Sequence, residues 1–262
     1  MYIERTLEGF LKKAAGQFPV TLVTGPRQVG KTTILQHLSK DERTYVTLDD
    51  PTLATLAREE PSLFLQRFKP PVLIDEIQYA PELLPHIKMA VDKERKNGMF
   101  WLTGSQQFQL MQGVTESLAG RVGIVNLLGL SLKELQHHAG KAVPFLPTEK
   151  QLQDRLKISS SLSLQDIYRV IWRGSYPALA LNDKADRDLF YRSYIQTYLQ
   201  RDIRDLANVG DEGTFLKFLR ATAARTGQLL NMSDMARDAD VSVTTAKRWL
   251  SILEASGIIY LL

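Results

Sequence analysis

The residues best suited to chemistry in this sequence form the stretch 25–32, which reads GPRQVGKT. This is the G-x-x-x-x-G-K-[ST] pattern, whose glycines let successive backbone N–H groups turn inward around phosphate oxygens. Lys31 would neutralise charge on the outer phosphates, and the hydroxyl of Thr32 would bind Mg²⁺. The pattern predicts a nucleoside triphosphate site with contacts from Gly25, Pro26, Arg27, Gln28, Val29, Gly30, Lys31, Thr32 and Thr33.

The flanking sequence supplies the elements that such a loop requires. The apolar run 20–23 predicts a buried strand before the loop, and residues 33–38 have helical spacing after it. The helix would begin beneath the phosphates and add the positive end of its dipole. The alternative is a glycine-rich turn that contains a lysine by chance, and the two flanking elements make it the weaker interpretation.

A second group of reactive side chains follows the apolar run 72–74. Because the run is apolar throughout, it predicts a strand buried on both faces, as in a parallel sheet. Asp75 and Glu76 would project from the carboxyl end of that strand, where such sheets bind ligands. We expect Asp75 to hold Mg²⁺ through a water molecule and Glu76 to orient and deprotonate the attacking water. A solvated acidic turn is the alternative, and it is weakened by the loop upstream.

A third apolar run, residues 99–102, ends in small polar residues that include Ser105. A hydroxyl at this position would lie near the γ-phosphate, which makes Ser105 a candidate sensor of the nucleotide. Serine is also a common residue at the start of a helix, so both interpretations stay open.

Composition limits the class of protein. The chain has 262 residues, of which 44% are hydrophobic and 24% charged, as in soluble globular proteins. A net charge of +4 permits a nucleic-acid partner without requiring one. The sequence has no cysteine, which excludes disulfides, thiolate metal sites and cysteine nucleophiles. Because it shows neither a secretory n-region nor an apolar run near the ~20 residues that span a bilayer, we expect a cytoplasmic protein without membrane contact.

Five motifs in order resemble a known family. GPRQVGKTT, YVTLDDP, VLIDEIQ, WLTGSQQF and SLAGRV look like the prokaryotic AAA-type ATP-binding family, in which a Walker ATPase core precedes a C-terminal region of unassigned function. The resemblance covers residues 1 to about 135. It implies an α/β P-loop NTPase of the AAA-like, ASCE type, with a five-stranded parallel sheet and helices on both faces. One strand would separate the two strands that carry the Walker A and Walker B motifs. The implied activity is Mg²⁺-dependent ATP hydrolysis.

The resemblance also suggests an arginine finger. In related ATPases the position just before the fifth strand often carries one, and here it is Arg121. Such a finger stabilises charge on the transferring phosphoryl group and usually acts across a subunit interface, which implies a homo-oligomer. A salt-bridged arginine at a strand edge is the alternative. Arg27, inside the loop, would instead act within one chain.

The chain divides into four expected regions. They are a P-loop core (1–138), a variable linker (139–163), a helical lid (164–210) and a winged helix-turn-helix (211–262). The resemblance implies that a Gly-x-x-Pro turn at 174–177 in the lid lies near the nucleotide base. Family members usually continue beyond the position of residue 262, so we expect the winged unit to be incomplete.

The last region is the source of two functional hypotheses. Helices expected at 215–226, 233–240 and 242–255, followed by a strand at 258–262, look like a winged helix-turn-helix. Six Lys/Arg against five Asp/Glu from Glu212 onward leave only +1, a weak electrostatic footprint for DNA, so a lid or protein-contact module with the same fold is at least as strong an alternative. The leading hypothesis is an ATPase whose turnover drives a conformational or assembly change. The other is a weakly hydrolysing or non-hydrolysing nucleotide switch that recruits DNA or a protein.

Overall fold

The computed structural model describes residues 2–40, 42–104, 113–114, 116–141, 146–158, 162–198 and 212–261. Its N-terminal part contains a parallel sheet of β1 (Val20–Thr24), β2 (Thr44–Thr47), β3 (Val72–Asp75), β4 (Phe100–Thr103) and β5 (Val122–Asn126). The strand order is β2-β3-β4-β1-β5, so β4 separates the strands that carry the phosphate loop and the acidic pair. This order confirms the predicted fold class.

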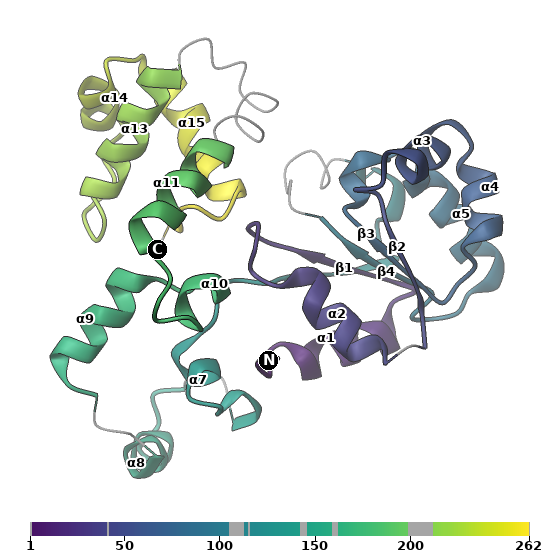
Figure 1. The fold of residues 1–262 in the computed structure, drawn as a ribbon, viewed down its shortest axis with the longest axis horizontal. Coiled ribbons are helices and arrows are strands. Elements are labelled where there is room, and N and C mark those ends of the chain that lie inside the picture. The colour runs from purple at the N-terminus through teal and green to yellow at the C-terminus, as the bar shows by residue number, and fades with distance from the viewer. Residues whose placement is uncertain are drawn as a thin grey trace.

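Helices cover both faces of the sheet (Figure 1). One face carries α1 (Glu8–Gln17) and α2 (Lys31–Ser39), and the other carries α3 (Pro51–Glu59), α4 (Pro61–Arg67) and α5 (Leu83–Glu94). Alternate strand residues point to opposite faces, so Leu22 packs with the α3–α5 side and Val23 with the α1–α2 side. Every residue of β1 is buried, as expected for a parallel sheet covered on both faces.

The parallel register gathers polar residues at the carboxyl-terminal ends of the strands. Val23 of β1 pairs with Thr103 of β4, and Thr47 of β2 pairs with Asp75 of β3. Both pairs lie at the carboxyl ends of their strands. The short helix η1 (Ile77–Tyr79) begins two residues after the end of β3.

The chain leaves the sheet through short helices. These are α7 (Leu132–Leu135), η2 (Ala139–Lys141), α8 (Glu149–Ile158), α9 (Leu164–Arg173) and α10 (Pro177–Ala180), followed by α11 (Arg187–Tyr198). Both α7 and α9 begin with a capping box, in which a serine and an acid three residues later satisfy the first free backbone amides.

The C-terminal helices have a core of their own. They are α13 (Glu212–Ala224), α14 (Met232–Ala239) and α15 (Val243–Ala255). The rings of Phe215 and Phe218 on α13 contact the Trp249 ring on α15, with centroids 5.1 and 5.6 Å apart. Because α14 and α15 are joined by a three-residue turn, they form a helix-turn-helix.

The strand predicted at 258–262 is wrong for the residues described there, 258–261, which form no strand. The N–H of Ile258 donates instead to the Leu253 carbonyl oxygen at 2.9 Å, at the end of α15. Ile258 and Ile259 pack against the C-terminal core. Their apolar character therefore reflects packing on helices, and residues 258–261 form no wing.

Candidate nucleoside triphosphate site

The loop between β1 and α2 has a backbone that requires glycine. Gly25 has φ +136° and Gly30 has φ +93°, values that side chains rarely allow. A Cβ on Gly25 would lie 2.1 Å from the carbonyl oxygen of Leu127, which follows β5. The first glycine of the motif therefore gives the loop both its turn and its close packing against the end of β5.

Gly25→Ala should lower the free energy of unfolding by about 1–3 kcal/mol, because it strains the backbone and displaces Leu127. Nucleotide binding should be lost with the loop geometry. Thermal denaturation and a nucleotide titration would measure both effects. The matched control is Gly16→Ala on α1, where a Cβ meets nothing within 4 Å and alanine favours the helix. A Gly25→Ala protein as stable as the wild type would contradict this account of the loop.

Lys31 begins α2, and its side chain returns to the loop. The residue is buried, and its ammonium group donates to the carbonyl oxygens of Pro26 at 2.9 Å and Gly25 at 3.2 Å. These acceptors satisfy a cation that would otherwise be costly to bury. A positive charge is thus held at the loop, beside the amino end of α2.

Asp75 joins the loop to the acidic end of β3. Its Oδ1 accepts a hydrogen bond from the Thr32 hydroxyl at 2.7 Å, and Thr103 donates to the same oxygen. The Tyr45 hydroxyl donates to Oδ2 at 3.1 Å. Burial, reinforced by the Asp75 charge, raises the pKa of Tyr45 to about 12, so Tyr45 stays a donor at neutral pH. Three hydroxyls from α2, β2 and β4 therefore fix a carboxylate that is 5% exposed.

Glu76 follows in an unusual conformation. Its φ of +58° lies in the left-handed region, which non-glycine residues adopt mainly where the surroundings enforce it. Its backbone N–H donates to Thr103 Oγ1 at 3.1 Å, and its carboxylate accepts from the Gln78 amide. The Thr103 hydroxyl thus connects the two residues, because it donates to the Asp75 carboxylate and accepts from the Glu76 backbone N–H.

The sequence interpretation missed four residues at this site: Tyr45, Gln78, Thr103, and Arg5, whose guanidinium donates to the Val29 carbonyl oxygen in the loop. Thr103 is the last residue of β4, whereas Tyr45 is the second residue of β2 and reaches Asp75 only through its long side chain. The rule that placed Asp75 at the carboxyl end of its strand would have found Thr103 on the neighbouring strand, but it would not have found Tyr45. Ser105 lies outside the described residues.

Arg121 lies at the amino-terminal ends of the strands, whereas the loop lies at their carboxyl-terminal ends. It comes before Val122, which pairs with Val20 at the start of β1, whereas the loop follows the end of β1. Its guanidinium binds the Asp92 carboxylate of α5 at 2.5 and 3.1 Å, which holds the pKa of Asp92 below its usual range. With five strand residues of about 3.3 Å each in between, Arg121 is out of reach of its own loop, and Arg27 is the candidate arginine beside it.

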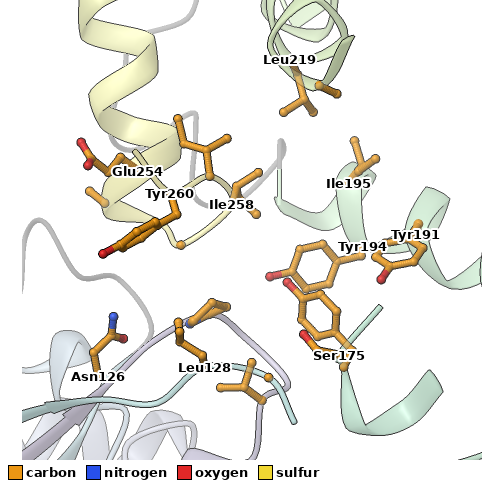
Figure 2. A pocket seen from close by; sticks show the side chains of 18 of the residues that line it. Asn126, Leu128, Ser175, Tyr191, Tyr194, Ile195, Leu219, Glu254, Ile258 and Tyr260 are labelled. Carbon is orange, nitrogen blue, oxygen red and sulfur yellow. The ribbon is translucent and has the colours of Figure 1, made fainter. Parts of the chain in front are cut away.

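A cavity of about 1240 Å³ opens beside the loop (Figure 2). The core contributes Pro26, Val29, Asn126 and Leu128, the turn 174–177 contributes Ser175 and Tyr176, α15 contributes Glu254, and the segment after α15 contributes Ile258 and Tyr260. The turn that was expected near the nucleotide base therefore lines the same cavity as the phosphate loop. Its mostly apolar walls with a few polar groups are typical of small-molecule sites.

The sheet order, the loop after β1 and the acids after β3 define a P-loop NTPase fold of the ASCE type. Residues 17–136 match the family model described as "AAA domain", which confirms that this part of the chain resembles an AAA-type P-loop domain. Residues 164–262 match a model described as "Domain of unknown function (DUF8612)".

Comparison with similar proteins shows how much of a longer relative this chain spans and which solved structure shares its fold. "Uncharacterized protein Rv2008c" of Mycobacterium tuberculosis and "Uncharacterized protein Mb2031c" of Mycobacterium bovis are each 31% identical over 245 residues, 93% of this chain and 49% of theirs. The chain thus spans about half the length of the curated relatives it matches. The Walker-type ATPase PABY2304 of Pyrococcus abyssi aligns over 97% of this chain and 89% of its own, with a TM-score of 0.57 and 16% identity, which shows the fold alone.

Two features are absent from the part of the chain that the structure describes. None of the helices in this part of the chain is both long and apolar enough to cross a bilayer. The same residues contain no group of three or more His, Cys, Asp or Glu arranged to hold a metal ion.

Proposed function

We propose that this chain binds Mg²⁺–ATP at the phosphate loop and hydrolyses it. The observation that supports this most directly is the 2.7 Å contact between the Thr32 hydroxyl and the Asp75 carboxylate. It joins the end of the Walker A motif to the Walker B aspartate, so both can act on one nucleotide. The adjoining cavity, lined by Tyr176 and Val29, would take the base.

The residues at this contact suit a divalent cation. Carboxylate and hydroxyl oxygens are the hard ligands that Mg²⁺ prefers, and Asp75 and Thr32 supply one of each within hydrogen-bonding distance. When bound, Mg²⁺ neutralises charge on the β- and γ-phosphates. Thr103 and Tyr45 would keep the Asp75 carboxylate in place.

Glu76 is the carboxylate that we assign to water. Asp75 is engaged by three hydroxyls, whereas Glu76 is only partly buried and is oriented by Gln78 and by its backbone bond to Thr103. A carboxylate fixed in this way would orient the attacking water and accept its proton. Lys31 would stabilise the charge that develops on the phosphoryl oxygens.

The arginine that completes the site would be Arg27 within the chain or Arg121 from a neighbouring copy. The proposal for Arg121 requires it to exchange Asp92 for the nucleotide of an adjacent subunit. Its partly exposed side chain is consistent with that exchange.

We also propose that nucleotide turnover is coupled to the C-terminal helices. Gly257, two residues beyond the end of α15, packs so closely on the loop that a Cβ there would lie 2.7 Å from Pro26 Cγ. Ser251 and Glu254 of α15 line the cavity beside the loop. This part of the helix-turn-helix therefore faces the nucleotide site, which favours a response to the nucleotide over an independent role.

Removal of the metal tests the proposed function. Phosphate release from ATP should require Mg²⁺ and be abolished by EDTA. Asp75→Asn should lower the rate at saturating Mg²⁺–ATP by at least about tenfold, since it removes the charge that holds the cation. The control is Asp49→Asn, at an exposed carboxylate just after β2. Hydrolysis unaffected by EDTA or by Asp75→Asn would contradict the assignment. Binding of ATP without turnover would favour the nucleotide switch, whose affinity for duplex DNA should fall with salt if DNA is the partner.

A further inference from the structure

We propose that Arg5 is a positioning residue for the phosphate loop and links that loop to the turn 174–177 of the lid. The inference rests on the proposed function, because the loop that Arg5 holds is the one assigned to the nucleotide. Arg5 precedes α1 and is 6% exposed, so it is a buried charge that no feature of the loop motif predicts.

One end of the guanidinium holds the loop itself. Arg5 Nη1 donates to the carbonyl oxygen of Val29 at 3.0 Å. Val29 comes directly before Gly30, whose left-handed backbone turns the chain into α2 at Lys31. A Cβ on Gly30 would lie 3.8 Å from the same Nη1 atom. Arg5 therefore fixes the last peptide before the residues that would contact the β- and γ-phosphates.

The other amino group holds the segment after β5. Arg5 Nη2 donates to the carbonyl oxygens of Leu128 at 2.7 Å and Gly129 at 3.1 Å. This segment carries the lid turn, because the N–H of Leu130 donates to the Ser175 carbonyl oxygen at 2.7 Å. A Cβ on Gly129 would lie 2.6 Å from the Ser175 carbonyl oxygen, so the two backbones are in close contact. A single side chain thus joins the loop to the segment on which Ser175 rests.

Glu134 sets the orientation of the guanidinium. It is 4% exposed, and its Oε1 accepts from Arg5 Nε at 3.1 Å and from the backbone N–H of Thr6 at 2.7 Å. Its Oε2 accepts from the backbone N–H of Ser131 at 2.7 Å. Burial alone would raise the pKa of Glu134, but these amides and the Arg5 charge lower it below its usual value, so the pair is ionised at neutral pH.

The geometry needs arginine in particular. The planar guanidinium directs separate N–H groups at Glu134, Val29 and the Leu128–Gly129 peptides, whereas the ammonium group of lysine is a point charge without that fixed fork. Lysine would keep the charge pair with Glu134 and lose the simultaneous hold on the loop and the lid segment. Arg5→Lys therefore separates positioning from charge.

The test measures the affinity for a fluorescent ATP analogue with Mg²⁺, at a temperature where every variant is folded by circular dichroism. Arg5→Lys and Arg5→Met should each weaken binding by about tenfold or more, since each loses charge-assisted hydrogen bonds to the loop. Ile87→Ala is the control for stability. Ile87 is fully buried on α5, on the sheet face away from α1 and α2, so its truncation should lower the melting temperature and leave the affinity unchanged.

The outcomes separate the two proposals. If the wild type does not bind the analogue, the proposed function fails. If the wild type binds and a folded Arg5→Lys protein binds equally tightly, or loses no more affinity than Ile87→Ala, the positioning role is overturned. Should neither Arg5 variant fold, Glu134→Gln serves instead. It keeps the shape of the side chain and should still weaken binding more than Ile87→Ala does, and an affinity equal to that of the wild type would overturn the inference.

Discussion

Replacing Glu76 with glutamine should leave ATP binding intact and slow hydrolysis by about 10²–10⁴-fold, the usual contribution of a general base. Glutamine keeps the size of the side chain and can still accept the hydrogen bond from Gln78, so the turn after β3 should keep its conformation. It cannot take a proton from water. Single-turnover phosphate release would measure the chemical step, and titration with a fluorescent nucleotide would measure binding.

The matched control for this experiment is Glu82→Gln. Glu82 is an exposed glutamate just before α5, and its side chain makes no capping hydrogen bond. The control should hydrolyse ATP at the wild-type rate. Equal rates for Glu76→Gln and the wild type would remove Glu76 from the role of base, and loss of nucleotide binding in Glu76→Gln would show that it acts mainly on the shape of the site.

Lys31→Met should lower the affinity for ATP by roughly 10- to 100-fold, the value of a charge-assisted hydrogen bond at a phosphate site. Methionine keeps an unbranched side chain of similar length but removes the charge, and it leaves the Gly25 and Pro26 carbonyl oxygens without the donor they now have. Isothermal titration with ATP and ADP would measure the loss, together with the melting temperature of each protein.

Lys12→Met controls for the change in net charge. Lys12 is an exposed lysine on α1, so its replacement makes the same chemical change as Lys31→Met away from the loop. Its removal should leave the affinity for ATP unchanged. If Lys31→Met bound ATP as tightly as Lys12→Met does, Lys31 would be a structural lysine of the loop and the proposed phosphate contact would be wrong.

Local sequence was enough to predict the centre of this site. The loop 25–32 follows an apolar strand and runs into a helix, and Asp75 ends a strand that is otherwise apolar, so each motif carries its own structural context. Once both strands are placed in one parallel sheet, their carboxyl ends meet at one edge without further information. The contact between Thr32 and Asp75 is the consequence.

The surrounding residues could not be found in this way, because they depend on contacts that are distant in the sequence. Arg5 and Glu134 are 129 positions apart, and nothing in either local sequence indicates a buried pair. The segment 258–261 shows the opposite error. Its β-branched and apolar residues fit a strand, but its first amide bonds to the end of α15 and its side chains pack against the C-terminal core.

The positions of the loop and of Arg121 at opposite ends of β1 and β5 restrict how copies of the chain could cooperate. For Arg121 to contact a nucleotide, the amino-terminal strand ends of one copy must approach the carboxyl-terminal strand ends of the next copy. Such a head-to-tail contact joins two different surfaces, so it repeats from copy to copy until a ring closes or a filament grows. A two-fold dimer would meet the same requirement only if its self-complementary interface contained both strand ends, so that each arginine reached the loop of the other copy.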